Sequence, residues 1–141
     1  MLAVTTSVIL AACGLAAGLL AAALHVLIFW MESFAWEGPL ARKTFGGTPE
    51  EARRHAFYAY NQGFYNLFLA IEVVLGTVLA WTTGGGLVWA GFALVVFGCA
   101  SMLGAAAALA ARSAEHRGAA VKQGALPALA LVALLASYLV A

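Results

Sequence analysis

Residues 73–111 read VVLGTVLAWTTGGGLVWAGFALVVFGCASMLGAAAALAA and contain no Lys, Arg, Asp or Glu. A helix needs about 20 apolar residues to cross a bilayer, so this stretch is long enough to cross twice. A turn is expected in its middle, where Gly84, Gly85 and Gly86 give a helix no reason to continue. Residues 1–31 and 123–141 also lack all four charged residue types. The sequence therefore predicts an integral membrane protein.

The composition excludes a water-soluble globule. Of the 141 residues, 65% are hydrophobic and 9% are charged, whereas a soluble domain carries about 25% charged residues. The net charge of +1 and the lack of a dense basic run give no indication of a nucleic-acid partner. Cys13 and Cys99 both lie in apolar stretches, which favours small buried residues over a disulfide.

The apolar blocks predict one all-α domain over residues 1–141, a bundle of four transmembrane helices at about 5–34, 49–82, 87–111 and 121–141. The second helix is expected to begin at Pro49, because Thr48-Pro49-Glu50-Glu51 has the pattern of a capping box with proline at the first helical position. The length of the chain allows a single domain.

The basic residues predict the orientation. All seven lie in two loops on the same side of the bundle: Arg42, Lys43, Arg53, Arg54, Arg112, Arg117 and Lys122. The positive-inside rule places these loops in the cytoplasm, so both termini are expected outside. The corresponding location is the inner (cytoplasmic) membrane of a cell, crossed several times.

Polar residues gather on one side of the helix at 49–82. At about 100° per residue, six of them fall within an arc of roughly 140°: Tyr58, Asn61, Gln62, Tyr65, Asn66 and Glu72. On the first helix, Gly18, His25 and Glu32 recur every seven residues and lie nearly in line. Gln123 enters at the same depth from the last helix. Ionisable groups inside a membrane usually mark function.

These residues predict a polar pocket that opens toward the cytoplasm. Its ligand-binding residues are His25, Glu32, Tyr58, Asn61, Gln62, Tyr65, Asn66, Glu72 and Gln123. Glu72, nearest the middle of the membrane, is expected to be protonated or hydrogen-bonded to a neighbouring helix, since a charge there costs about 2.5–3.5 kcal/mol. The alternative is that these groups only join helices, although interhelical hydrogen bonds average only about 0.6 kcal/mol.

Other candidate sites have less support. No Glu-x-x-His or His-x-x-x-His pair fixes metal ligands on one helical face, so no metal site is expected. His55 at the membrane edge and His116 in a loop are expected to be solvated. Gly91, Gly98 and Gly104 are interpreted as packing contacts rather than a ligand loop. The sequence identifies no cofactor and no catalytic residue.

Three segments resemble a known family: HVLIFWMESFAW at residues 25–36, AYNQGFYNLFLA at 59–70 and QGALPA at 123–128. They are similar to the DUF1304 family of small bacterial and fungal membrane proteins, and the similarity runs from about residue 25 to the end. Its most specific part is the Asn-Gln-Gly-x-Tyr-Asn core at residues 61–66. The resemblance implies a four-helix membrane protein and leaves the activity open.

Three functions fit these observations. The first is binding or transport of a small polar or amphipathic ligand in the polar pocket, and transport by four helices would require an oligomer. The second is an enzyme acting on a lipophilic substrate, with His25 or Glu32 as general acid or base. The third is an accessory subunit of a larger membrane complex, docking through its small-residue helices. The partners in these cases are the lipid bilayer and a homo-oligomer or membrane complex.

Overall fold

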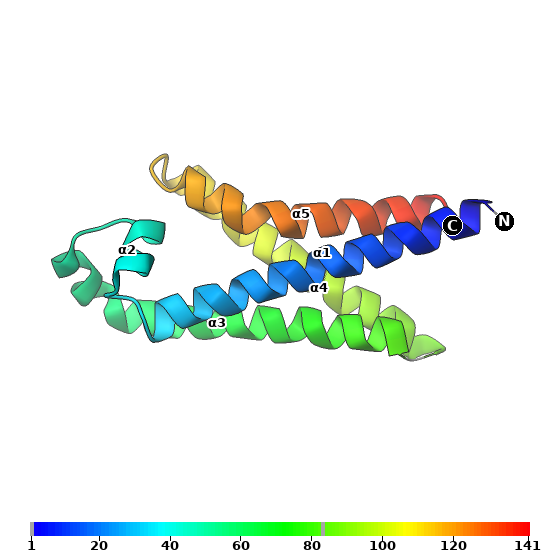
Figure 1. The fold of residues 1–141 in the computed structure, drawn as a ribbon, viewed down its shortest axis with the longest axis horizontal. Coiled ribbons are helices and arrows are strands. Elements are labelled where there is room, and N and C mark those ends of the chain that lie inside the picture. The colour runs from blue at the N-terminus through cyan, green and yellow to red at the C-terminus, as the bar shows by residue number, and fades with distance from the viewer. Residues whose placement is uncertain (1, 83) are drawn as a thin grey trace.

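The protein is all-helical, as predicted. The computed structural model describes the backbone of residues 2–82 and 84–141, and side chains from residue 4 onward in the first helix. Five helices are present in this part of the chain (Figure 1): α1 (Leu2–Ser33), α2 (Pro39–Phe45), α3 (Pro49–Thr82), α4 (Gly86–Arg112) and α5 (Arg117–Leu139). All but α2 are long and apolar enough to cross a membrane. The chain is therefore a multi-pass membrane protein with four candidate spans.

The short helix α2 was not predicted from the sequence. Proline stands at its first position, and it ends at Gly46, whose φ of 82° lies in the left-handed region that favours glycine. The ring of Trp36 packs against Phe45, with centroids 5.6 Å apart, and its indole N–H donates to the carbonyl of Ala52 at 2.8 Å. These contacts hold α2 between the ends of α1 and α3.

The predicted capping box is confirmed at the start of α3. The backbone N–H of Thr48 donates to the Glu51 carboxylate at 2.8 Å, and the backbone N–H of Glu51 donates to the Thr48 hydroxyl at 3.3 Å. Two N–H groups that the first turn would otherwise leave unpaired are thus satisfied. Helix α3 begins at Pro49 for this reason.

The connections divide the molecule into two ends (Figure 1). The basic end holds the α1–α3 connection with α2, the α4–α5 connection, and all seven basic residues. The termini end holds both ends of the chain and the predicted glycine turn, in which residue 83 lies outside the described residues. Helix α1 lies between α3 and α5, and α4 completes the bundle behind it (Figure 1).

Helix α4 crosses the bundle obliquely. It comes close to α3 at one end and to α5 at the other, and glycines allow both contacts. Near the termini end, a Cβ on Gly76 of α3 would lie 2.7 Å from the carbonyl oxygen of Gly91. Toward the basic end, a Cβ on Gly124 of α5 would lie 3.0 Å from the Ala106 side chain. Helix α4 therefore leans from α3 at one end to α5 at the other, as Figure 1 shows.

The packing role predicted for glycines of α4 is confirmed at two positions. A Cβ on Gly91 would meet the backbone of α3, and one on Gly98 would lie 2.6 Å from a methyl group of Val73. The prediction is wrong for Gly104, where a Cβ would find no described atom of another element within 4 Å. Gly104 faces away from the bundle because the approach of α4 to α5 is made through Ala106 instead.

Candidate functional site

A hydrogen bond between α1 and α3 forms the centre of the candidate site. Asn66 is 6% exposed, and its side-chain amide donates to the Glu32 carboxylate at 2.8 Å and to the backbone carbonyl of Gln62 at 3.2 Å. The amide therefore fixes the Glu32 side chain on the inner side of α3.

Gly63 allows the two helices to come this close. A Cβ at this position would meet the Ser33 hydroxyl and would lie 3.0 Å from the Phe29 carbonyl and 3.2 Å from the Glu32 Cβ. Ser33 in turn donates to the carbonyl of Tyr60 at 3.0 Å. The glycine of the Asn-Gln-Gly-x-Tyr-Asn core thus has a structural role, which is to bring the Glu32 carboxylate within reach of Asn66.

His25 lies on the same side of α1 as Glu32, seven residues earlier, and is completely buried. Its Nδ1 is 2.8 Å from the carbonyl oxygen of Ala21. Because a carbonyl only accepts, this contact assigns the proton to Nδ1, which leaves Nε2 of a neutral imidazole with a free lone pair. Nε2 is buried and has no hydrogen-bond partner among the described residues. We name His25, Glu32 and Asn66 the polar cluster.

Four of the predicted residues lie on the surface of the chain instead of inside it. We name Tyr58, Asn61, Gln62 and Tyr65 the polar flank; all four are exposed. The polar arc of α3 does not coincide with its buried side, which is made by residues such as Ala59, Gly63 and Ala70. Of the six polar residues in the arc, only Asn66 also lies on the buried side of α3.

The polar flank lies on the side of α3 that α4 contacts nearer the termini end. At about 100° per residue, Tyr58, Asn61 and Tyr65 lie within about 60° of Gly76 and Glu72. Gly76 contacts α4 directly, and a Glu72 carboxylate oxygen lies 3.6 Å from where a Cβ on Gly98 of α4 would stand. The flank is exposed because α4 has leaned away from α3 at that level (Figure 1).

The two remaining predicted residues are half-buried and are not joined to the polar cluster. Glu72 on α3 and Gln123 on α5 make no side-chain hydrogen bond within residues 2–82 and 84–141. Glu72 was expected to be either protonated or hydrogen-bonded to a neighbouring helix, and the second of these is not seen in this part of the chain. The structure thus brings Glu32 and Asn66 together, with His25 on the same face of α1 as Glu32, and leaves the other six predicted residues outside this group.

His116 differs from the expectation of a solvated side chain. Its Nε2–H donates to the Phe45 carbonyl at 3.0 Å, and its Nδ1 is hydrogen-bonded to the Ser113 hydroxyl at 2.7 Å. This histidine therefore ties the α4–α5 connection to the end of α2, beside a cavity of about 180 Å³. Among the described residues, no three His, Cys, Asp or Glu side chains lie close enough to hold a metal ion.

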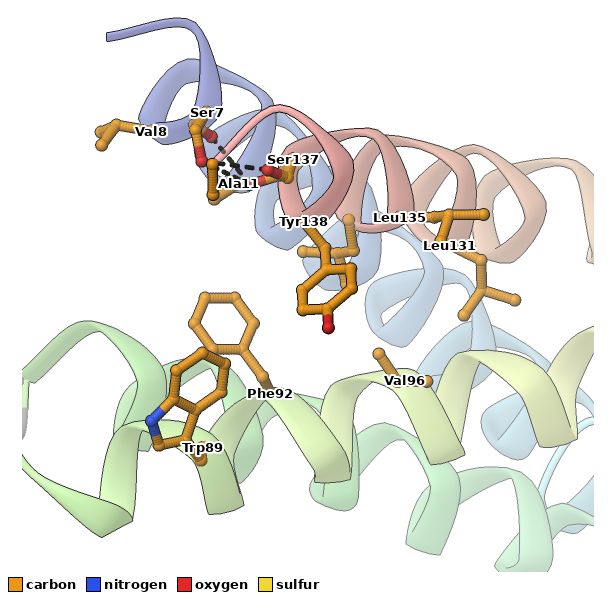
Figure 2. A pocket seen from close by; sticks show the side chains of 12 residues that line it. Ser7, Val8, Ala11, Trp89, Phe92, Val96, Leu131, Leu135, Ser137 and Tyr138 are labelled. Atoms are coloured by element: carbon orange, nitrogen blue, oxygen red, sulfur yellow. Dashed lines mark hydrogen bonds between the residues drawn. The ribbon is translucent and has the colours of Figure 1, made fainter. Parts of the chain in front are cut away.

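A larger cavity, of about 570 Å³, lies at the termini end between α1, α4 and α5 (Figure 2). None of the nine predicted residues lines it. Its walls are Ser7, Val8, Ala11, Trp89, Phe92, Val96, Leu131, Leu134, Leu135, Ser137, Tyr138 and Ala141. The cavity was not predicted from the sequence, because the predicted site was built from polar residues. The sequence did contain one indication of the cavity. Trp89 and Tyr138 are aromatic residues in terminal turns of two predicted helices.

Comparison with known proteins identifies the family of the chain but assigns it no activity. The model of the family described as "Protein of unknown function (DUF1304)" matches residues 19–135. No curated protein and no solved structure matches the chain. The match covers most of the chain and includes the whole polar cluster, the polar flank and the QGALPA segment. The resemblance seen in the sequence is thereby confirmed: the chain belongs to the DUF1304 family of membrane proteins.

Proposed function

We propose that the protein binds a small polar or amphipathic ligand between its helices near the basic end. The observation that carries this proposal is the buried Nε2 of His25, which no described residue pairs. A buried polar atom without a hydrogen bond costs about 1–3 kcal/mol. A ligand that donates a hydrogen bond to Nε2 would remove that cost and would be held between α1 and its neighbours.

Each part of the polar region has a role in this proposal. Glu32, oriented by Asn66 at 2.8 Å, supplies an acceptor for a second donor of the ligand. In this proposal the exposed polar flank forms the entry route, and the half-buried Glu72 and Gln123 supply further polar groups to the ligand. Transport of the ligand is a further step and would require an oligomer, since a bundle of four helices is small for a transporter.

We further propose that the basic end faces the cytoplasm and both termini face outward. The support is that all seven Lys and Arg residues lie at that end, in short connections. Alkaline phosphatase, which is active only outside the cytoplasm, is expected to be active when fused after residue 141 and inactive when inserted after Gly47. The reverse pattern would contradict this orientation.

Extraction of the purified protein tests the binding proposal. Wild-type protein purified in mild detergent is expected to carry a small organic molecule, detected by mass spectrometry, at a level at least tenfold above that of His25→Leu. Val26→Leu is the control, because Val26 is the next residue and is 45% exposed. A high-resolution density map is expected to show the molecule beside Nε2. A single water in that place, with equal extracts from all three proteins, would contradict the proposal.

A further inference from the structure

The 570 Å³ cavity at the termini end has the dimensions of a binding site. Ligand sites in proteins usually enclose about 300–1,000 Å³. It exists because α4 leans away from α5 toward this end, after contacting it at Gly124 near the basic end. Figure 2 shows Trp89 and Phe92 on α4 facing Tyr138 on α5 across the opening. This cavity is separate from the polar cluster, and the inference drawn from it does not depend on the proposed function.

The walls of the cavity suit a hydrocarbon. No charged residue of the described chain lines it. Its two serines satisfy each other, because Ser7 donates to the backbone carbonyl of Ser137 at 3.0 Å and Ser137 donates to that of Ser7 at 2.8 Å (Figure 2). Both hydroxyl protons are thus engaged, and a polar group placed against the apolar walls, away from the Tyr138 hydroxyl, would lose its hydrogen bonds to water, which is unfavourable.

The mouth of the cavity differs from its interior. Trp89 stands in the first turns of α4 and Tyr138 in the last turn of α5, and their side chains are 69% and 73% exposed. Tryptophan and tyrosine gather at the level of lipid headgroups, where one side of the ring is apolar and the other is wet. The two aromatic side chains are therefore expected at headgroup level, with the apolar walls extending from there into the membrane.

The size of the cavity distinguishes between apolar occupants. A helix with its side chains is about 10 Å across, so 570 Å³ would admit little more than one turn of a second copy's helix. A single flexible chain can follow the walls along α4 and α5. We propose that this cavity binds one acyl chain of a membrane phospholipid, with the headgroup beside Trp89 and Tyr138.

Photo-crosslinking with a defined lipid tests this proposal. The wild-type protein is placed in nanodiscs of phosphatidylethanolamine and phosphatidylglycerol that contain a phosphatidylethanolamine with a diazirine in its acyl chain. Cross-links are located by mass spectrometry of peptides. They are expected to concentrate on wall residues of the cavity, such as Val8, Phe92 and Leu135, at least fivefold above equally exposed residues on α3.

Matched variants show whether the cross-links depend on the cavity itself. Val96→Trp fills the cavity and is expected to lower the cross-link yield on its walls at least fivefold. Val74→Trp, on α3 and outside the cavity, is the control, because the two valines are 41% and 43% exposed. If Val96→Trp does not fold, Leu135→Trp replaces it, with Val132→Trp as its control; these residues are 59% and 65% exposed.

Two results would overturn the proposal. Cross-links spread evenly over the exposed faces of all four long helices, and unaffected by either filling variant, would mean that lipid only surrounds the protein. Protein-to-protein cross-links through the cavity walls in place of lipid adducts would assign this surface to contact between copies of the chain.

Discussion

Replacing Gly91 by alanine is expected to separate α4 from α3 and to lower the free energy of unfolding by about 3 kcal/mol or more. The added Cβ would meet the backbone nitrogen of Ala80 and would lie 2.6 Å from the carbonyl oxygen of Gly76. Both atoms belong to the backbone of α3, so no side chain can rotate to make room. The two helices must move apart, and the buried contact between Gly98 and Val73 is then disturbed as well.

Gly104→Ala is the matched control. It adds the same methyl group to the same helix, at a position where no described atom of another element lies within 4 Å. Alanine is more favourable than glycine inside a helix by roughly 0.5–1 kcal/mol, so this variant is expected to be as stable as the wild type or slightly more so. Unfolding in a detergent titration, followed by circular dichroism, measures both. Equal stability of the two variants would show that α3 and α4 do not cross at Gly91.

The fold follows from the sequence where one physical constraint dominates. Apolar blocks long enough to cross a bilayer predict the four long helices, because every backbone polar group in lipid must be paired within the protein and a helix pairs its own. The capping box at Thr48 places the start of α3 to the residue. Helix α2 was missed because its seven residues are too short to show a periodic pattern. Its stability comes from contacts such as that between Trp36 and Phe45.

The candidate site was predictable only in part. The seven-residue spacing of His25 and Glu32 correctly places both on one side of α1, and Asn66 is the one member of the polar arc that reaches the interior. The exposure of Asn61 and Tyr65 was not predictable, because it depends on the tilt of α4. That tilt is set by contacts between distant residues, such as Gly76 with Gly91, which no periodicity within one helix reveals.

The tilt of α4 connects the two proposals. Because α4 lies against α3 at the termini end and against α5 at the basic end, it leaves α3 uncovered at one end and α5 uncovered at the other. The uncovered part of α3 carries the polar flank, and the uncovered part of α5 borders the apolar cavity behind Trp89 and Tyr138. The oblique course of α4 thus leaves a polar surface uncovered at one end of the bundle and an apolar surface at the other.

Replacing His25 by leucine is expected to stabilise the ligand-free protein by about 1–3 kcal/mol while removing ligand binding. The gain is the cost of burying Nε2 without a partner. Leucine fills a similar volume with apolar atoms that suit the surrounding core. The carbonyl of Ala21 loses the bond from Nδ1 but keeps the backbone hydrogen bond that every residue inside a helix makes. A side chain that lowers stability yet serves binding is typical of functional sites.

Asn66→Leu is the matched comparison, because it removes a buried polar group that does have hydrogen-bond partners. It removes an amide that is hydrogen-bonded, leaves the Glu32 carboxylate without its 2.8 Å partner, and is expected to lower the free energy of unfolding by about 1–3 kcal/mol. Thermal or detergent unfolding of ligand-free protein therefore changes in opposite directions for the two leucine variants. If His25→Leu is also destabilised, the imidazole contributes to helix packing, and its free nitrogen is not kept for a ligand.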